Sequence, residues 1–152
     1  MIDHIWSIVC GRSTTDRETN NLSLIDVIEQ LNVLGPLPDP SIKAALPMQY
    51  EVVSLWSRSQ PLEAEETKGR IKLITPTGNE ALSYEFPVNL LENPRMRTQL
   101  RSFGFPLSGV GRYVFLVEIQ RVDAQWETVA RLPMQLESVT QIPGSMLVPQ
   151  SP

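Results

Sequence analysis

Proline punctuates this chain at short intervals, and that spacing limits the secondary structure that can form. The sequence of 152 residues holds 13 prolines but only 8 glycines. Most of the prolines separate one apolar segment from the next: Pro36, Pro38, Pro40, Pro47, Pro61, Pro76, Pro87, Pro94, Pro106, Pro133 and Pro143. Proline removes a hydrogen bond from a helix interior and clashes with the preceding turn. A mostly helical protein is therefore not expected.

Between the prolines, apolar and polar residues alternate with the two-residue period of a β-strand. Strands are predicted at residues 4–11, 47–57, 70–75, 81–90, 113–120 and 126–136. Within 47–57 the apolar side changes between Val52 and Val53, which predicts a bulge or a strand that changes sheets. In the last segment the alternation groups Trp126 with the apolar face. The turn sequence "PTGN" around Gly78 predicts a hairpin between 70–75 and 81–90.

Two segments show a period that also fits a helix. Residues 22–34 fit either a helical stripe or a bulged strand, and we prefer the strand because of its β-branched residues. Residues 93–104 predict a short crossover helix, with Asn93 as the cap and Gly104 at the end. Met96, Leu100 and Phe103 would then share one face.

These elements predict a mainly β fold of about seven or eight strands with one short crossover helix. An antiparallel β-sandwich of the immunoglobulin-like or C2-like kind fits best, and a small closed β-barrel is the alternative. The length corresponds to one domain. We assign it to residues 1–140 and expect a loose C-terminal tail at 141–152.

The charge and the cysteine content indicate a soluble cytoplasmic protein. The sequence has 13 Lys and Arg residues against 17 Asp and Glu, a net charge of −4, which does not favour general nucleic-acid binding. Cys10 is the single cysteine, so no intramolecular disulfide can form. The N-terminal residues do not resemble a secretory signal, and no apolar run approaches the roughly 20 residues that span a bilayer.

No motif in the sequence predicts catalysis, a metal site or a cofactor. The glycines of "SGVG" (108–111) lack the spacing of a nucleotide-binding loop and precede a strand rather than a helix, so we interpret them as a turn. His4 and Cys10 lie six residues apart on one predicted strand, on the same face but about 20 Å apart. We expect no enzyme activity, no metal and no cofactor.

The most suggestive polar feature is a cluster of three arginines, Arg95, Arg97 and Arg101. Guanidinium groups that converge can hold phosphate or carboxylate. The alternative is that they form the solvated face of the predicted helix, whose other face carries the apolar residues. We retain the three arginines as candidate ligand-binding residues.

Two segments of the chain resemble a family of small uncharacterised bacterial proteins. The matching positions are Leu22, Ser23, Leu24, Ile25 and Val27, then Gly111, Tyr113, Phe115 and Val117. The resemblance implies a β-sandwich and a bacterial origin, and it implies no activity and no site residues.

The function predicted from the sequence is that of a non-catalytic binding or assembly module. Such a module would contact a protein partner through its loops or a sheet edge, or associate with itself as a homodimer. Neither nucleic acid nor a membrane is expected as a partner. The alternative function is binding of an anionic ligand or nucleic acid through Arg95, Arg97 and Arg101.

Overall fold

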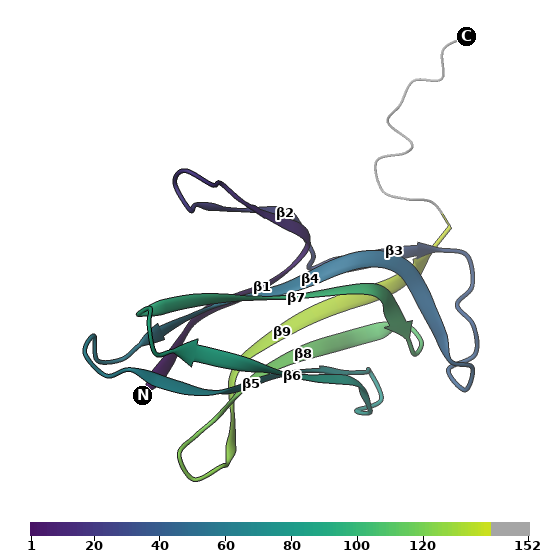
Figure 1. Cartoon of the computed structure of the whole chain (residues 1–152). Helices are drawn as coiled ribbons and strands as arrows, with labels where there is room; N and C mark the ends of the chain where they lie inside the picture. Colours follow the sequence, from purple (N-terminus) through teal and green to yellow (C-terminus); the bar gives the residue numbers. More distant parts are fainter. Residues whose placement is uncertain (141–152) are drawn as a thin grey trace.

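A computed structural model of the chain describes residues 1–140, which form β-strands and connecting turns (Figure 1). The nine strands are β1 (Ile2–Thr15), β2 (Leu22–Val27), β3 (Gln30–Leu34), β4 (Ala44–Arg58), β5 (Glu65–Ile74), β6 (Glu80–Leu90), β7 (Arg95–Leu107), β8 (Gly111–Gln120) and β9 (Trp126–Val139). None of these residues lies in a helix, so this range holds no helix that could cross a membrane. The predicted tail at 141–152 lies outside the described residues.

The strands form two sheets that pack against each other. The first sheet has the order β2-β1-β4-β7, and the second has the order β3-β9-β8-β5-β6. Neighbouring strands are antiparallel except for β3 and β9, which are parallel. Each sheet keeps two open edges, so residues 1–140 form a sandwich and not the closed barrel of the alternative prediction.

The core fills the space between the two sheets, as the two-residue alternation predicts. Tyr113, Phe115, Val117 and Ile119 of β8 are all fully buried and point to the same side. Phe105 of β7 packs against Phe115 and Tyr113 from the opposite sheet. The "SGVG" segment is the turn that leads into β8, with positive φ angles at both of its glycines.

The helix predicted at 93–104 is wrong, because this segment is most of strand β7. Met96 and Leu100, the positions that suggested a helical stripe, also share one face of a strand with Thr98 between them. Gly104, assigned to the helix end, adopts a positive φ of 99° within the strand. Pairing with β4 along nearly the whole segment outweighs the weak local preference for helix.

The strand preferred for residues 22–34 is confirmed, but the segment divides into β2 and β3 in different sheets. The chain crosses between the sheets after Asp26, whose backbone has a φ of 56°. A short polar side chain tolerates this left-handed conformation better than most. The crossing explains why the segment did not fit one continuous strand. The structure has nine strands, more than the seven or eight predicted, because this segment forms two strands and the predicted helix is strand β7.

The bulge or change of sheet predicted between Val52 and Val53 is wrong, because β4 lies in one sheet and is in continuous register with β7 from Gln49 to Ser57. Val52 faces the core and Val53 faces outward, yet both are fully buried. The actual register shift lies earlier, between Leu46 and Gln49. Val53 is buried although it faces outward, because another segment of the chain covers the outer face of β4.

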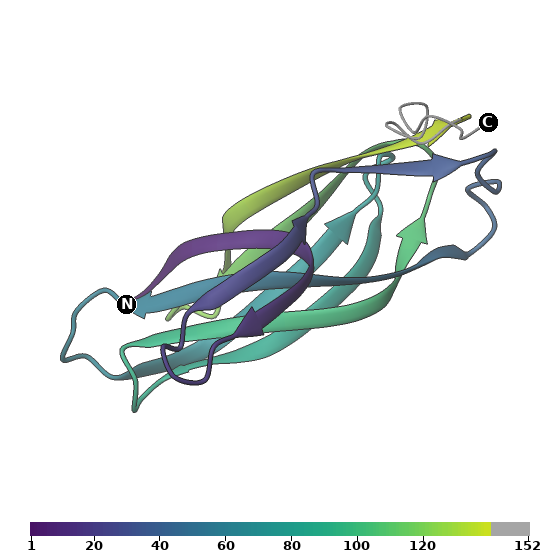
Figure 2. The same cartoon turned by 90° about the horizontal axis from the view of Figure 1, so that it is seen from above.

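The cover is the hairpin arm, which we define as residues 11–27 at the end of β1 and in β2. Figures 1 and 2 show that this arm bends away from the plane of the first sheet and lies over its outer face. The tip of the arm is bonded to the sheet: the Arg97 Nη2 atom of β7 donates to the Asn20 backbone carbonyl at 2.8 Å. The arm therefore reaches from β1 to the edge strand β7.

The sequence pattern suggested that prolines separate the strands, but not all of them do. Pro47, Pro87, Pro106 and Pro133 lie inside long strands. Pro47 lies at the register shift in β4, and Pro133 precedes the point where β9 gains its second neighbour, β3. Pro87 and Pro106 lie on edge strands, where a missing N–H costs no ladder bond.

Candidate functional site

Strand β7 brings the three candidate arginines to one edge of the molecule. Because side chains alternate along a strand, Arg95, Arg97 and Arg101 all project from the outer face of the first sheet. Phe103 continues the same row and is 76% exposed. The arginines thus share a face, although a strand and not a helix places them there.

Arg101 is bound to a buried carboxylate on the neighbouring strand. Its Nε atom donates to Glu51 Oε1 at 2.8 Å, and Glu51 is only 1% exposed. The Ser13 hydroxyl of the hairpin arm donates to the other oxygen of Glu51. Gln99 Nε2 donates to Ser13 Oγ at 2.9 Å, which completes a network from the arm through β4 to β7. Arg101 therefore has a structural role in holding the arm.

Arg95 and Arg97 keep uncompensated positive charges. Arg97 donates to a neutral backbone carbonyl, that of Asn20. Among the described residues, neither Arg95 nor Arg97 takes part in an ion pair. Arg95 and Arg97 line a cavity of about 320 Å³ with Asn20, Leu55 and Met96. Arg101 is not part of this lining and pairs with Glu51, so the three arginines form a row and do not converge on one site.

Behind this row, an apolar slot opens between the edges of the two sheets. It has a volume of about 270 Å³, and its walls are Met96 and Leu100 of β7 and Phe86 and Pro87 of β6. Ile71 of β5, which is buried, forms its floor. The slot faces the same open edge as β7 but lies on the core side of the strand.

The outer face of the second sheet holds the tryptophan that the sequence assigned to the core. Trp126 is half-buried there, with the Arg70 guanidinium 4.0 Å from its ring centroid. Arg70 also pairs with Glu118 across the strands at 2.6 Å. A register shift between Val117 and Glu118 reverses the alternation of β9, which is why the grouping of Trp126 with the apolar face is wrong.

The other two tryptophans lie on the first sheet, so the three do not line a common groove. Trp56 is fully buried in the core, and its indole N–H donates to the Thr98 hydroxyl at 3.0 Å. Trp6 is half-buried and pairs with Leu55, a residue of the outer face.

His4 and Cys10 do not share a face, contrary to the prediction. A register shift between His4 and Trp6 turns the imidazole toward the core side, where it packs edge-on against Trp56. Its Nε2 atom lies 2.6 Å from the Ser7 hydroxyl, which lies 2.6 Å from that of Ser54. Burial lowers the pKa of His4 below its usual 6.5, so the ring is neutral near pH 7.

Cys10 is buried on the outer face, paired across the strands with Glu51. Burial and the nearby carboxylate raise the pKa of the thiol. The thiolate is the reactive form of cysteine, so this environment suits a packing role. Within residues 1–140, no three metal-binding side chains lie together.

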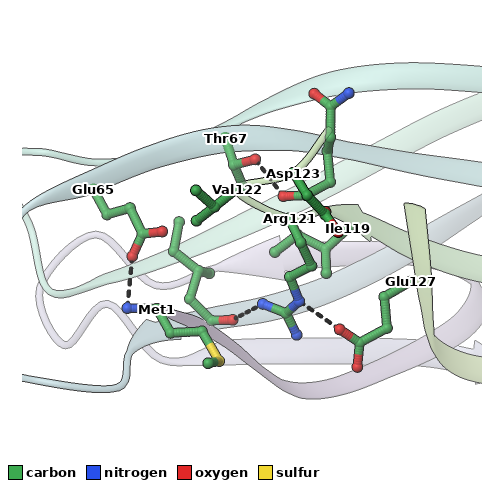
Figure 3. Close-up of a pocket in the computed structure, with 10 residues that line it drawn as sticks. Met1, Glu65, Thr67, Ile119, Arg121, Val122, Asp123 and Glu127 are labelled. Atoms are coloured by element: carbon green, nitrogen blue, oxygen red, sulfur yellow. Dashed lines mark hydrogen bonds and ion pairs between the residues drawn. The ribbon is translucent and has the colours of Figure 1, made fainter. Parts of the chain in front are cut away.

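A cleft of about 690 Å³ lies where β1 begins, beside the turn between β8 and β9 (Figure 3). Its polar groups bond to one another. Arg121 donates to the Ile2 carbonyl at 2.9 Å and pairs with Glu127. The amine of Met1 lies 2.7 Å from Glu65. These bonds join the two sheets and pair both cationic groups of the cleft with carboxylates.

Comparison with known proteins identifies no family. No protein-family model matches the chain, and no curated protein matches it. Among solved structures, the chain is similar to the soluble domain of PmoD from Methylocystis sp. ATCC 49242 (Rockwell), with 10% identity and a TM-score of 0.34 over 88% of this chain and 96% of that chain. It is also similar to an immunoglobulin-like protein from Pseudomonas aeruginosa, with 12% identity and a TM-score of 0.34 over 88% and 98% of the two chains.

These TM-scores are too low to support any argument, so the sandwich assignment rests on the strand pairing described above. The mainly β architecture implied by the resemblance to small bacterial proteins is present. Bacterial origin stays a prediction.

The sequence pattern did not predict that Glu51 pairs with an arginine of this cluster. A signal was present, because Glu51 is a lone charge in the otherwise apolar or neutral run from Tyr50 to Trp56. A carboxylate at a buried position needs a partner. Which partner it takes is decided only by the register between β4 and β7.

Proposed function

We propose that this domain is a non-catalytic, cytoplasmic protein-binding module that accepts an extended acidic segment of a partner along the edge of β7. The observation that carries the proposal is the open edge of this 13-residue strand, together with its row of arginines. An extended peptide can add to such an edge as a further strand through main-chain hydrogen bonds. The buried Cys10 fits a reducing compartment, because the fold needs no disulfide.

Strand β7 suits strand addition better than the other three edges. Strands β2 and β3 are only six and five residues long. Strand β6 carries Pro87 in its interior, and a proline on an edge strand removes a donor from the open side. In β7 the only proline, Pro106, lies next to the end, and residues 95–103 pair with β4 in continuous register, so they form a long regular edge.

The charge of β7 selects an acidic partner and disfavours a second copy at this edge. In an antiparallel pair of two β7 strands, the arginine row of one copy would face that of the other. Like charges directly opposite each other destabilise a sheet. Carboxylates at the same positions would instead pair with Arg95 and Arg97, whose charges are not compensated within the described residues.

The proposal is tested by using NMR to measure the hydrogen-exchange rates of the β7 backbone amides with and without a bound peptide. The probes are two peptides of about eight residues, an ordinary strand length, in which glutamate alternates with threonine or with valine. We expect slower exchange of the β7 amides that point away from β4, and no change in β6. Versions methylated on alternate backbone nitrogens, which cannot complete the ladder, should lose this effect.

Charge-reversal variants supply the matched control. Arg95→Glu with Arg97→Glu should weaken binding, whereas Arg112→Glu with Arg131→Glu makes the same charge change on the outer face of the second sheet and should not. Binding should also weaken as salt rises. The proposal fails if neither peptide protects β7, if methylated peptides protect it equally, or if a single-stranded oligonucleotide binds β7 more tightly than both peptides.

A further inference from the structure

We infer that the partner segment alternates acidic with apolar residues, so that one face of the added strand pairs with the arginine row and the other fills the apolar slot. This inference rests on the proposed function and specifies the chemistry of the partner. Its basis is the position of the row and the slot on opposite sides of the same strand.

The first step is the alternation of β7 itself. Arg95, Arg97 and Arg101 project from the outer face, while Met96 and Leu100 project toward the core side. A strand that adds to β7 continues its pleat, so its own side chains alternate between the same two faces. Cross-strand neighbours on one face lie about 5 Å apart, close enough for direct contact.

The second step concerns the outer face of the added strand. Residues there would meet guanidinium groups that keep their charge, above all those of Arg95 and Arg97. Aspartate or glutamate matches these groups, since guanidinium and carboxylate form paired hydrogen bonds. Lysine or arginine at those positions would place like charges opposite each other.

The third step concerns the inner face. Residues there would point toward the slot, which has walls from Met96, Leu100 and Phe86. These three side chains are only partly buried, and they pack against the core at its open edge. Aliphatic side chains entering the slot would extend the core at this margin, and polar side chains would lose their water without a partner.

The two peptides described above separate this inference from the proposed function. The peptide that alternates glutamate with valine should bind at least about tenfold more tightly than the one with threonine, because its apolar side chains leave water. A block peptide, with the same glutamates and valines in two separate runs, should bind more weakly than the alternating one. An alternating lysine–valine peptide should bind more weakly still.

A variant of the slot supplies an independent readout. Met96→Gln should weaken binding of the valine peptide while leaving that of the threonine peptide unchanged. Met48→Gln, at another half-buried methionine in the first sheet, is the matched control and should alter neither. The Met96 methyl resonance of the wild-type protein should shift only with the valine peptide.

The outcomes distinguish the two levels of the argument. If the threonine or block peptide protects β7 as well as the valine peptide does, the proposed function stands and the alternating pattern is overturned. If lysine–valine binds as tightly as glutamate–valine, the acidic half of the pattern is overturned. If no peptide protects β7, both the inference and the proposed function are overturned.

Discussion

Removing the Arg101 side chain tests how the hairpin arm is held on the sheet. Glu51 is only 1% exposed, and Arg101→Ala would leave its carboxylate with the Ser13 hydroxyl as its one described side-chain partner. Losing one hydrogen bond to a charged group costs about 1.5–3 kcal/mol, and breaking a fully buried ion pair costs about 3–5 kcal/mol. The Arg101 side chain is 62% exposed, so water can reach the vacated position. We therefore expect the free energy of unfolding to fall by about 2 kcal/mol.

Urea denaturation followed by tryptophan fluorescence measures this change. The midpoint should fall while the m-value stays the same, because the surface exposed on unfolding hardly changes. For a chain of this size, about 2 kcal/mol corresponds to a fall in Tm of about 4–8 °C. Arg95→Ala is the matched control, because Arg95 has no ion-pair partner among the described residues, and it should stay within about 0.5 kcal/mol of wild type.

A double-mutant cycle isolates the pair. Glu51→Gln removes the carboxylate charge while keeping the shape of the side chain, and the double variant should lose less than the sum of the two single variants. We expect a coupling of about 1 kcal/mol or more. Equal stability of Arg101→Ala and Arg95→Ala, with no coupling to Glu51, would refute the role of this network.

Three further predictions concern the core and its margins. Phe115→Ala should lower the free energy of unfolding by about 3–5 kcal/mol in urea titrations, because the ring is fully buried between the sheets; a loss below about 1 kcal/mol would contradict the packing. Gly69→Ala should cost about 1–3 kcal/mol, because the new Cβ would lie 2.2 Å from the Phe86 ring, and Phe86→Leu in the same chain should recover part of this loss. Because the folded pKa of His4 is lowered, the unfolded chain binds more protons below about pH 6.5, so stability should fall as the pH drops through that range. His4→Gln should flatten this part of the stability profile, and an unchanged slope would exclude His4 as its source.

The sandwich was predictable because its inner face repeats every two residues over long stretches. The row from Tyr113 to Ile119 has no competing period. Gly78, with its positive φ, clearly marks the hairpin turn between β5 and β6. The helix at 93–104 could not be rejected locally, because Met96 and Leu100 fit both periods. Only the twelve-pair ladder with β4, which joins residues far apart in the sequence, decides in favour of the strand.

Register shifts limit how far alternation can be extended from sequence. One shift separates His4 from the face of Cys10, and another moves Trp126 from the core to the outer surface. A single extra residue reverses every side chain beyond it, yet it leaves little trace in composition. Errors of this kind affected the placement of individual residues and not the class of the fold.

The amino-acid sequence by itself determined that this chain is built mainly from β-strands around one apolar core, because alternation and proline spacing are local properties. It also identified Arg95, Arg97 and Arg101 as a basic cluster. Only the tertiary structure decided that these arginines lie on an edge strand, that Arg101 is bound to Glu51, and that an apolar slot lies behind them. The physical reason is that strand order and register depend on pairing between distant segments, which no local pattern encodes.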